Sequence, residues 1–280
     1  MLVSENLGRP FLKWAGGKKW LVQHINALLP RDFSGSYYEP FVGAGIFYFT
    51  LCPNRALLSD LNEDLIKTYE AIKTDPDLVI NMLEKYPYDS DFYYSMRARK
   101  PRSLHGHAAR LIYLNRTCWN GLYRVNRKGE FNVPFGRHKN PRICDADNLR
   151  NVSLVLQNTK LLSADFEQAV QKAKSGSLVY FDPPYITGHQ NNGFHMYNNR
   201  LFAWSDQERL ARVAFALSSR GVFVLVSNAD HANIRELYPD FYKYRITRKS
   251  LIGGLNSSRG DITESLFSNY PLEGLEAEII

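Results

Sequence analysis

Four short apolar runs constrain the fold of this chain more than any other feature. They cover residues 36–41, 56–60, 177–181 and 221–226, and segments with helical periodicity separate them at 45–51, 63–73, 166–173 and 205–218. Apolar runs bounded by glycine, aspartate and proline are typical of strands buried on both faces of a parallel sheet. The alternation therefore predicts a doubly wound α/β fold, in which ligands bind at the carboxyl ends of the strands.

Polar residues stand at the ends of these expected strands. They are Glu39, Asp60, Asp182 and Asn228. Because the carboxyl ends of parallel strands meet at one edge of a sheet, these residues predict a binding site there. The last helical segment has Ser205 followed by Glu208, a capping-box pattern that predicts its start.

The positive charge of the chain is concentrated in one stretch. The net charge is +7, but residues 97–142 hold twelve Lys or Arg and a single acid, Glu130. This stretch therefore carries +11 and the rest of the chain −4. Solvated helix faces usually mix charges of both signs, so a concentration of one sign favours a polyanion such as nucleic acid as the partner.

The basic stretch also interrupts the alternation of strands and helices. It begins with helical segments at 92–96 and 108–115, and then becomes polar, with turn signals at Asn120-Gly121, Lys128-Gly129 and Phe135-Gly136. We expect residues 68–150 to form an inserted, mainly helical module, with residues 1–67 and 151–280 forming the α/β core.

The turn after the first strand, Glu39-Pro40-Phe41-Val42-Gly43-Ala44-Gly45, is suited to a nucleoside ligand. Two glycines let the backbone approach a ligand, and Asp60 can accept hydrogen bonds from ribose hydroxyls. The third glycine of the dinucleotide fingerprint is missing, since Tyr48 stands there. The turn therefore favours S-adenosylmethionine over a dinucleotide, although a plain strand-to-helix turn remains an alternative.

Asp182-Pro183-Pro184-Tyr185 follows the third apolar run directly. Two prolines end a strand and make a rigid turn, but strand termination alone requires neither the aspartate nor the aromatic residue. The amino group of a nucleobase is a poor nucleophile because it is conjugated with the ring. A carboxylate and a neighbouring carbonyl can accept its hydrogens, and a tyrosine can stack on the base. The motif therefore predicts methylation of an amino nitrogen, of adenine or of cytosine, in DNA or in RNA.

Near the N-terminus, Lys13-Trp14-Ala15-Gly16-Gly17-Lys18 can bring charge and backbone amides to a ligand, or can simply begin a helix. It is not a P-loop, because the GxxxxGK[ST] frame is absent. The histidines show no metal-ligand spacing, so no metal is expected. Three scattered cysteines and the lack of an apolar run of membrane-spanning length favour the reducing cytoplasm and no contact with a membrane.

These motifs, in this order, make the chain similar to the Dam family of DNA adenine methylases over about residues 9–270. The segments 113–116, 120–126 and 129–137 carry the resemblance most specifically, and they resemble members that methylate the adenine of GATC. The resemblance implies a Rossmann-like methyltransferase sheet with an inserted DNA-recognition module. It also implies S-adenosylmethionine as methyl donor, S-adenosylhomocysteine as product, and double-stranded DNA as the partner of a cytoplasmic monomer.

The resemblance also implies roles for individual residues. Those expected around S-adenosylmethionine are Trp14, Lys18, Glu39, Phe41, Gly43, Gly45, Asp60, Asp165, Phe166 and Asp182. The flipped target adenine would meet Asp182, Pro183 and Tyr185. Those expected at the DNA are Lys13, Trp119, Asn120, Leu122, Arg124, Pro134 and Arg137. Arg124 would read a guanine and Trp119 would insert into the duplex, which fits the chemistry of both side chains; for Trp119 the alternative is a core aromatic.

The chain departs from the family pattern at two places. The family's Pro-Leu-Ser-x-Thr-like run after the tyrosine is replaced by residues 187–193, although Phe194 and Tyr197 are kept, and His138 stands where a tyrosine is common. Near the C-terminus, residues 257–260 and Glu264 match a family loop that lies near DNA. Alternatives to adenine methylation in GATC are another adenine target, cytosine N4, an RNA substrate, or a DNA-binding regulator without activity. The intact Asp182, Tyr185 and Asp60 argue against the last.

Overall fold

The computed structural model describes residues 8–185, 202–249 and 261–280. The chain forms two compact units. The first unit is made of residues 1–23 and 42–165, and the second of residues 24–41 and 166–280.

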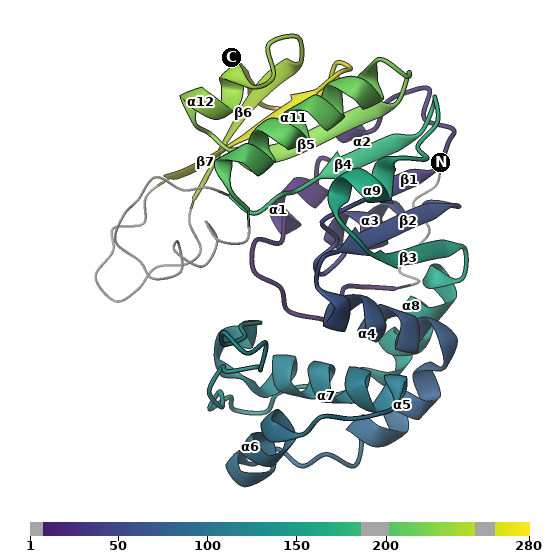
Figure 1. The fold of residues 1–280 in the computed structure, drawn as a ribbon, viewed down its shortest axis with the longest axis vertical. Helices are drawn as coiled ribbons and strands as arrows, with labels where there is room; N and C mark the ends of the chain where they lie inside the picture. The colour runs from purple at the N-terminus through teal and green to yellow at the C-terminus, as the bar shows by residue number, and fades with distance from the viewer. Residues whose placement is uncertain (1–7, 186–201, 250–260) are drawn as a thin grey trace. The chain divides into compact units, whose positions relative to one another are not determined.

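The first unit is mainly helical and contains two parallel strands (Figure 1). Strand β2 (Ala56–Asp60) pairs with β3 (Thr159–Ser163), so that Asp60 lies opposite Ser163. Two short helices, α1 (Lys19–Val22) and α3 (Ile46–Leu51), precede β2. The chain between the two strands forms α4 (Glu63–Thr74), α5 (Pro76–Leu83), α6 (Ser90–Ala98), α7 (Leu104–Thr117), the 3-10 turn η1 (Trp119–Gly121) and α8 (Ala146–Leu156).

The helices of the first unit begin where side chains satisfy their first amide groups. Asn62 accepts a hydrogen bond from the Leu65 amide at 3.1 Å and so caps α4. Ser103 caps α7 in the same way, with the Gly106 amide at 3.1 Å. Short polar side chains are preferred at these positions because they satisfy amides that have no partner within the helix. Helix α4 then packs against α7, α8 and both strands.

The second unit is a mixed sheet with helices. Its strands are β1 (Tyr37–Glu39), β4 (Leu178–Phe181), β5 (Phe223–Ala229), β6 (Tyr242–Lys249), β7 (Asp261–Ser268) and β8 (Glu278–Ile279), in the order β1-β4-β5-β7-β6-β8. The first three are parallel, and β7 and β6 continue the sheet in antiparallel pairing. Its helices are α2 (Ile25–Leu28), α9 (Phe166–Val170), α11 (Trp204–Ser218) and α12 (Ala232–Glu236).

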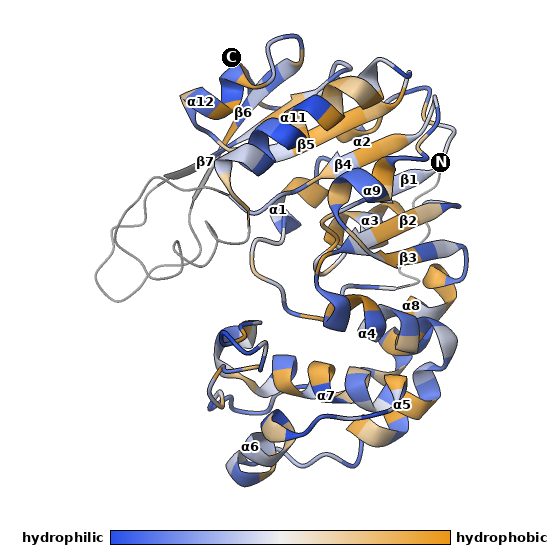
Figure 2. Cartoon of the chain, in the orientation of Figure 1, coloured by the Kyte–Doolittle hydropathy of each residue, from blue (hydrophilic) through white to orange (hydrophobic). Residues whose placement is uncertain are grey.

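The centre of this second sheet is its most apolar part. All four residues of β4 are buried, as are Val224, Leu225 and Val226 of β5. Figure 2 shows both strands as hydrophobic, with α11 lying along them and carrying hydrophilic residues on its outer side. Burial of a leucine or valine side chain stabilises the fold by about 1.5–3 kcal/mol. The carboxyl ends of β4 and β5 are therefore held in fixed positions.

The α/β fold with a Rossmann-like sheet is confirmed, and so are the four expected strands and the helices expected beside them. The predicted capping box of Ser205 and Glu208 is wrong. Helix α11 begins one residue earlier, at Trp204, because the Asp206 carboxylate accepts a hydrogen bond from the Ala203 amide at 2.9 Å. The inserted module of residues 68–150 stays a proposal. Among the described residues, no helix has the length and apolar character needed to cross a bilayer.

Candidate active site and nucleic-acid interface

Asp182 is the first residue after the buried strand β4 in the second unit. Its Oδ1 accepts a hydrogen bond from the Ser227 hydroxyl of β5 at 2.7 Å. The Ser227 hydroxyl in turn lies 3.1 Å from the Tyr180 hydroxyl, inside the sheet. The carboxylate is therefore held from the neighbouring strand, where it could accept hydrogens from an amino group.

Tyr185 is held by a second residue of the same sheet. Its hydroxyl donates to Glu264 Oε2 of β7 at 2.7 Å, and Glu264 is only 3% exposed. Burial raises the pKa of the Tyr185 hydroxyl well above its usual value, and the negative charges of Asp182 and Glu264 raise it further. The hydroxyl therefore stays protonated and acts as a hydrogen-bond donor.

Phe41 and Phe166, both expected at the cofactor, lie together in the second unit. Their ring centroids are 5.5 Å apart, and the ring centroid of Phe202 lies 5.6 Å from that of Phe41. The guanidinium of Arg209 stands 4.1 Å from the centroid of the Phe166 ring. Glu39, at the end of β1, is buried and accepts a hydrogen bond from the Tyr37 hydroxyl at 2.8 Å. An aromatic cluster of this kind can hold a flat ring such as adenine.

In the first unit, Asp60 lies at the end of β2 against the glycine turn. Its Oδ2 accepts a hydrogen bond from the Gly43 amide at 3.2 Å, and its Oδ1 accepts one from the Asn62 amide at 2.9 Å. Burial raises the pKa of the Asp60 carboxyl, although these two amides lower it in part. The Tyr69 hydroxyl donates to the Gly43 carbonyl at 3.1 Å, which supports the turn from α4.

Gly43 cannot be replaced easily, for two reasons. Its φ is +47°, and a Cβ at this position would lie 2.8 Å from Cδ1 of Trp14. Trp14 is itself stacked on Tyr123, with ring centroids 5.1 Å apart. The structure thus brings Trp14, Gly43 and Asp60 together as expected, while Gly45 (φ +65°) precedes α3.

The two lysines of the N-terminal motif have different surroundings. The Lys18 ammonium donates to the Gly16 carbonyl at 2.9 Å, and the side chain is buried. Lys13 is exposed, and its backbone is tied to the Asn115 side chain by hydrogen bonds of 2.8 Å. Its side chain lies where a Cβ on Gly121 would be, so Lys13 stands beside the 3-10 turn η1. Asp165, the last residue of the first unit, is half-buried.

Apart from Lys13, the residues expected at DNA lie on one irregular hairpin, residues 118–138. Two isolated bridges, Cys118 with Phe135 and Val125 with Phe131, hold it, and the Trp119 amide donates to the Pro134 carbonyl at 2.9 Å. Trp119 is 53% exposed, which rules out a core aromatic. The other exposed members of the expected set are Asn120, Arg124, Pro134 and Arg137, while Leu122 is half-buried. His138 faces inward and contacts the Cys118 carbonyl at 2.8 Å.

Arg124 is oriented by Asn132 across this hairpin. Its Nε donates to Asn132 Oδ1 at 2.8 Å, and one terminal nitrogen lies 3.4 Å from the Asn132 carbonyl oxygen. The Arg124 side chain is exposed, so its other guanidinium N–H groups can donate hydrogen bonds to a ligand.

Part of the positive stretch stabilises the unit itself. Arg110 donates to the Met96 and Arg97 carbonyls at 2.9 and 2.6 Å. Arg97 donates to the Val133 carbonyl at 3.2 Å, and Arg142 pairs with Asp145 at 2.8 Å. The net charge of +11 therefore overstates the number of cations that can meet phosphates.

Sequence reasoning missed Ser227 and pointed to its neighbour Asn228. In the structure β5 continues to Ala229, and the side-chain Nδ2 of Asn228 donates to Gln207 Oε1 of α11 at 2.9 Å. Because successive strand residues point to opposite faces, Ser227 meets Asp182 and Asn228 meets the helix. Asn132 and Tyr69 were also missed. Residues 187–193, Phe194, Tyr197 and 257–260 lie outside the described residues.

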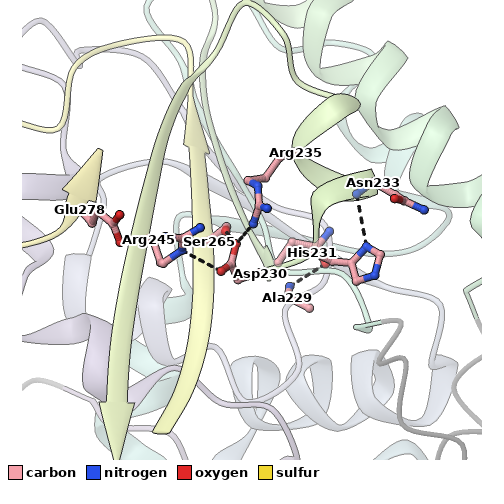
Figure 3. A network of polar contacts seen from close by, with 9 residues as sticks. Ala229, Asp230, His231, Asn233, Arg235, Arg245, Ser265 and Glu278 are labelled. Carbon is pink, nitrogen blue, oxygen red and sulfur yellow. Dashed lines mark hydrogen bonds and ion pairs between the residues drawn. The ribbon is translucent and has the colours of Figure 1, made fainter. Parts of the chain in front are cut away.

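A partly buried acid that follows β5, Asp230, holds the end of this strand to its neighbours (Figure 3). It accepts hydrogen bonds from Arg245 Nε at 2.8 Å and from the Ser265 hydroxyl at 2.9 Å, and it pairs with Arg235. Burial opposes ionisation of Asp230, but these hydrogen bonds and the charge of Arg235 outweigh it, and the pKa of the carboxyl is lowered. Ser265 is the neighbour of Glu264, so the cluster fixes β7 beside the tyrosine.

Comparison with known proteins identifies the class. The profile of the D12 class N6 adenine-specific DNA methyltransferases matches residues 14–252. The type II methyltransferase M1.LlaDCHI of Lactococcus lactis subsp. cremoris is 41% identical over 272 residues, covering 94% of this chain and 95% of that protein. The type II methyltransferase M.MjaIII of Methanocaldococcus jannaschii is 38% identical over 286 residues, covering 94% and 99%. The DNA adenine methylase of Serratia marcescens is 35% identical over 271 residues, covering 92% and 97%.

The fold and the match together define a Rossmann-like methyltransferase. The chain belongs to the family of D12 class N6 adenine-specific DNA methyltransferases. It is an enzyme that methylates adenine in DNA, which excludes the alternatives of cytosine N4, an RNA substrate and an inactive regulator.

Proposed function

We propose that the enzyme transfers the methyl group of S-adenosylmethionine to N6 of an adenine flipped out of duplex DNA, within GATC. The observation that supports this most directly is the Asp-Pro-Pro-Tyr motif, in which Asp182 is held by Ser227 and Tyr185 by Glu264. The GATC target is proposed from the resemblance of segments 113–116, 120–126 and 129–137 to the Dam family.

The residues present fit S-adenosylmethionine. Asp60 offers a partly buried carboxylate beside the Gly43 turn for ribose hydroxyls, and Phe41 and Phe166 offer ring faces for adenine. We propose contacts to the cofactor for these residues and for Trp14, Lys18, Glu39, Gly45, Asp165 and Asp182. When bound, the sulfonium would supply an electrophilic methyl group, so that no separate activation of the carbon is needed.

The protein's own groups then prepare the amino nitrogen. The Asp182 carboxylate and the main-chain carbonyl of Pro183 would each accept a hydrogen bond from one of the two amino N–H groups. These two hydrogen bonds would draw the nitrogen out of conjugation with the ring and make its lone pair available. Tyr185 would stack on the base. Once the amino nitrogen carried the transferred methyl group, its proton would become acidic and would pass to solvent water. Strong general-base catalysis is therefore not required, and positioning and polarisation carry the reaction.

The exposed side chains of the 118–138 hairpin suit recognition of the duplex. We propose that Arg124 reads a guanine, with Leu122 and Pro134 beside it, and that Trp119 and Asn120 fill the gap left by the flipped base. Lys13 and Arg137 would contact phosphates, which position the protein without specifying sequence.

We further propose that the enzyme is a monomer and that it works in the cytoplasm. Sedimentation of the purified chain would test whether it is a monomer.

The test is methyl transfer from radiolabelled S-adenosylmethionine to short duplexes. We expect label in adenine of a duplex with one GATC, and none in the same duplex already carrying N6-methyladenine on both strands. Asp182→Ala should abolish transfer while cofactor binding, measured by calorimetry, largely survives. Equal labelling of duplexes without GATC would contradict the target sequence. No labelling of adenine in any duplex by a folded, cofactor-binding protein would contradict the function.

A further inference from the structure

Two buried polar residues from neighbouring strands lie directly against the catalytic motif in the second unit. Ser227 of β5 is 0% exposed and Glu264 of β7 is 3% exposed. Each makes a hydrogen bond of 2.7 Å to the motif, Ser227 to Asp182 and Glu264 to Tyr185. Burying polar groups costs free energy unless they are hydrogen-bonded, so these contacts form a specific arrangement and are not incidental surface contacts.

We propose that Ser227 and Glu264 are positioning residues for methyl transfer: Ser227 sets the plane of the Asp182 carboxylate, and Glu264 sets the position of the Tyr185 ring. The inference rests on the proposed roles of Asp182 and Tyr185 and adds the residues through which the sheet orients them.

The argument for Ser227 concerns rotation of the carboxylate. The terminal torsion of an aspartate is broad, so the side chain alone does not fix the direction of its two oxygens. The hydrogen bond from Ser227 to Oδ1 fixes the carboxylate plane and with it the direction of Oδ2. The nearby Tyr180 hydroxyl, at 3.1 Å from the serine oxygen, restricts the rotamer of Ser227 in turn.

The argument for Glu264 concerns the tyrosine ring. A tyrosine anchored only at its backbone can swing its ring between rotamers of the first side-chain torsion. The bond from its hydroxyl to Glu264 anchors the far end of the ring as well. The ring therefore stays where a base can stack on it, and the preference of the phenolic hydrogen for the ring plane favours one orientation of its face. Because the hydroxyl is protonated, it donates and the carboxylate accepts.

Strand register explains why these two residues reach the motif. In the antiparallel pair of β5 and β7, Ser227 lies opposite Leu266 and Ala229 lies opposite Glu264. Figure 3 shows Asp230 joined to Ser265 and Arg245. Ser265 points to the opposite face of the sheet from Glu264, so these contacts hold β7 in this register from the other face. Two adjacent strands thus supply one anchor each.

The first test uses Ser227→Ala and Ser227→Cys, with Ser268→Ala as matched control. Ser268 is also a fully buried serine of this sheet, but its hydroxyl bonds the Tyr270 carbonyl. We expect Ser227→Ala to lower kcat roughly 10- to 100-fold with little change in KM, since small misplacements of reacting groups have effects of this size. Ser227→Cys, a poorer donor of similar volume, should fall between, and Ser268→Ala should keep wild-type kcat.

The second test follows the target base. A duplex with 2-aminopurine at the target adenine reports extrusion and stacking by its fluorescence. Tyr185→Phe and Glu264→Ala should change the signal of the bound complex alike, and Glu264→Ala should add nothing in the Tyr185→Phe background. Glu264→Gln should keep most of the wild-type signal, because its amide oxygen can accept the same hydrogen bond. Glu276→Gln, a change at an exposed residue of the same unit, serves as control.

The outcomes separate this inference from the proposed function. If the wild-type enzyme methylates adenine and extrudes 2-aminopurine, but Ser227→Ala keeps kcat or Glu264→Ala acts equally with and without the Tyr185 hydroxyl, the positioning role is wrong. If the wild-type protein transfers no methyl group to adenine, the proposed function itself fails. Cofactor binding and thermal unfolding, measured for every variant, distinguish misplacement of the catalytic side chains from loss of the fold. If an alanine variant does not fold, the near-isosteric Ser227→Cys and Glu264→Gln provide the same comparison.

Discussion

Replacing Arg124 by alanine is expected to weaken discrimination at one base pair and to leave general DNA binding nearly intact. Two of the five guanidinium N–H groups are directed at Asn132, one from Nε at 2.8 Å and one from a terminal nitrogen at 3.4 Å. Of the remaining three, two form the terminal edge that can contact two acceptors side by side, which matches N7 and O6 of guanine.

The size of the effect follows from this geometry. A bidentate contact of arginine with guanine contributes about 1–3 kcal/mol of discrimination. Arg124→Ala should therefore reduce the preference for the correct base pair by about 5- to 150-fold. Asn132→Ala keeps the charge and removes only the orientation. Because the pair is exposed, we expect its loss to be near the lower end of a hydrogen bond's net contribution, roughly 2- to 5-fold.

The assay is competitive methylation of two duplexes that differ at a single base pair, which measures the ratio of their kcat/KM values. Arg127→Ala is the matched control, since Arg127 is an exposed arginine at the turn of the same hairpin. It should leave the ratio unchanged and at most lower the salt dependence of binding by about one unit of slope. An equal loss on all sequences with Arg124→Ala would make Arg124 a phosphate contact and refute the reasoning.

Four further predictions concern the other sites. Trp119→Ala should change stability by less than about 0.5 kcal/mol, because the side chain is exposed, yet should lower 2-aminopurine extrusion and methylation; a large drop in Tm would contradict this. Gly43→Ala should abolish calorimetric cofactor binding, because its Cβ would meet Trp14 at 2.8 Å; unchanged affinity would show that the turn tolerates a side chain. Burial raises the pKa of Asp60, so cofactor affinity should begin to fall, as the pH is lowered, at a higher pH than an exposed aspartate would give; Asp60→Asn should bind weakly at every pH. The lowered pKa of Asp230 contributes stability that is present above the pKa of the unfolded state and is lost as the pH falls through the folded pKa. Asp230→Ala should therefore cost about 1–3 kcal/mol in urea unfolding at pH 7, and the difference from wild type should shrink in acid.

Some features could not be predicted because competing local signals are close in energy. Ser205, Asp206 and Glu208 can each stabilise the start of a helix. The start falls at Trp204 because the Asp206 carboxylate accepts a hydrogen bond from the Ala203 amide. Strands β6 and β7 were missed because they lack the continuous apolar runs of β4 and β5. Strand β6 buries only alternate residues such as Tyr244 and Ile246. Strand β7 is buried over residues 264–268, but three of these are polar (Glu264, Ser265 and Ser268), so neither strand gives an apolar run in the sequence.

The amino-acid sequence by itself determined the local chemistry of this enzyme. A buried strand followed by Asp182-Pro183-Pro184-Tyr185, a glycine turn with Asp60, and a hairpin rich in exposed cations are each specified by neighbouring residues. Tertiary structure alone decided what orients them. Ser227 and Glu264 are 45 and 79 residues from their partners in the chain, and reach them only through sheet order and register. Side-chain direction alternates along a strand, so a shift of one residue would exchange Ser227 for Asn228, and no local pattern distinguishes the two.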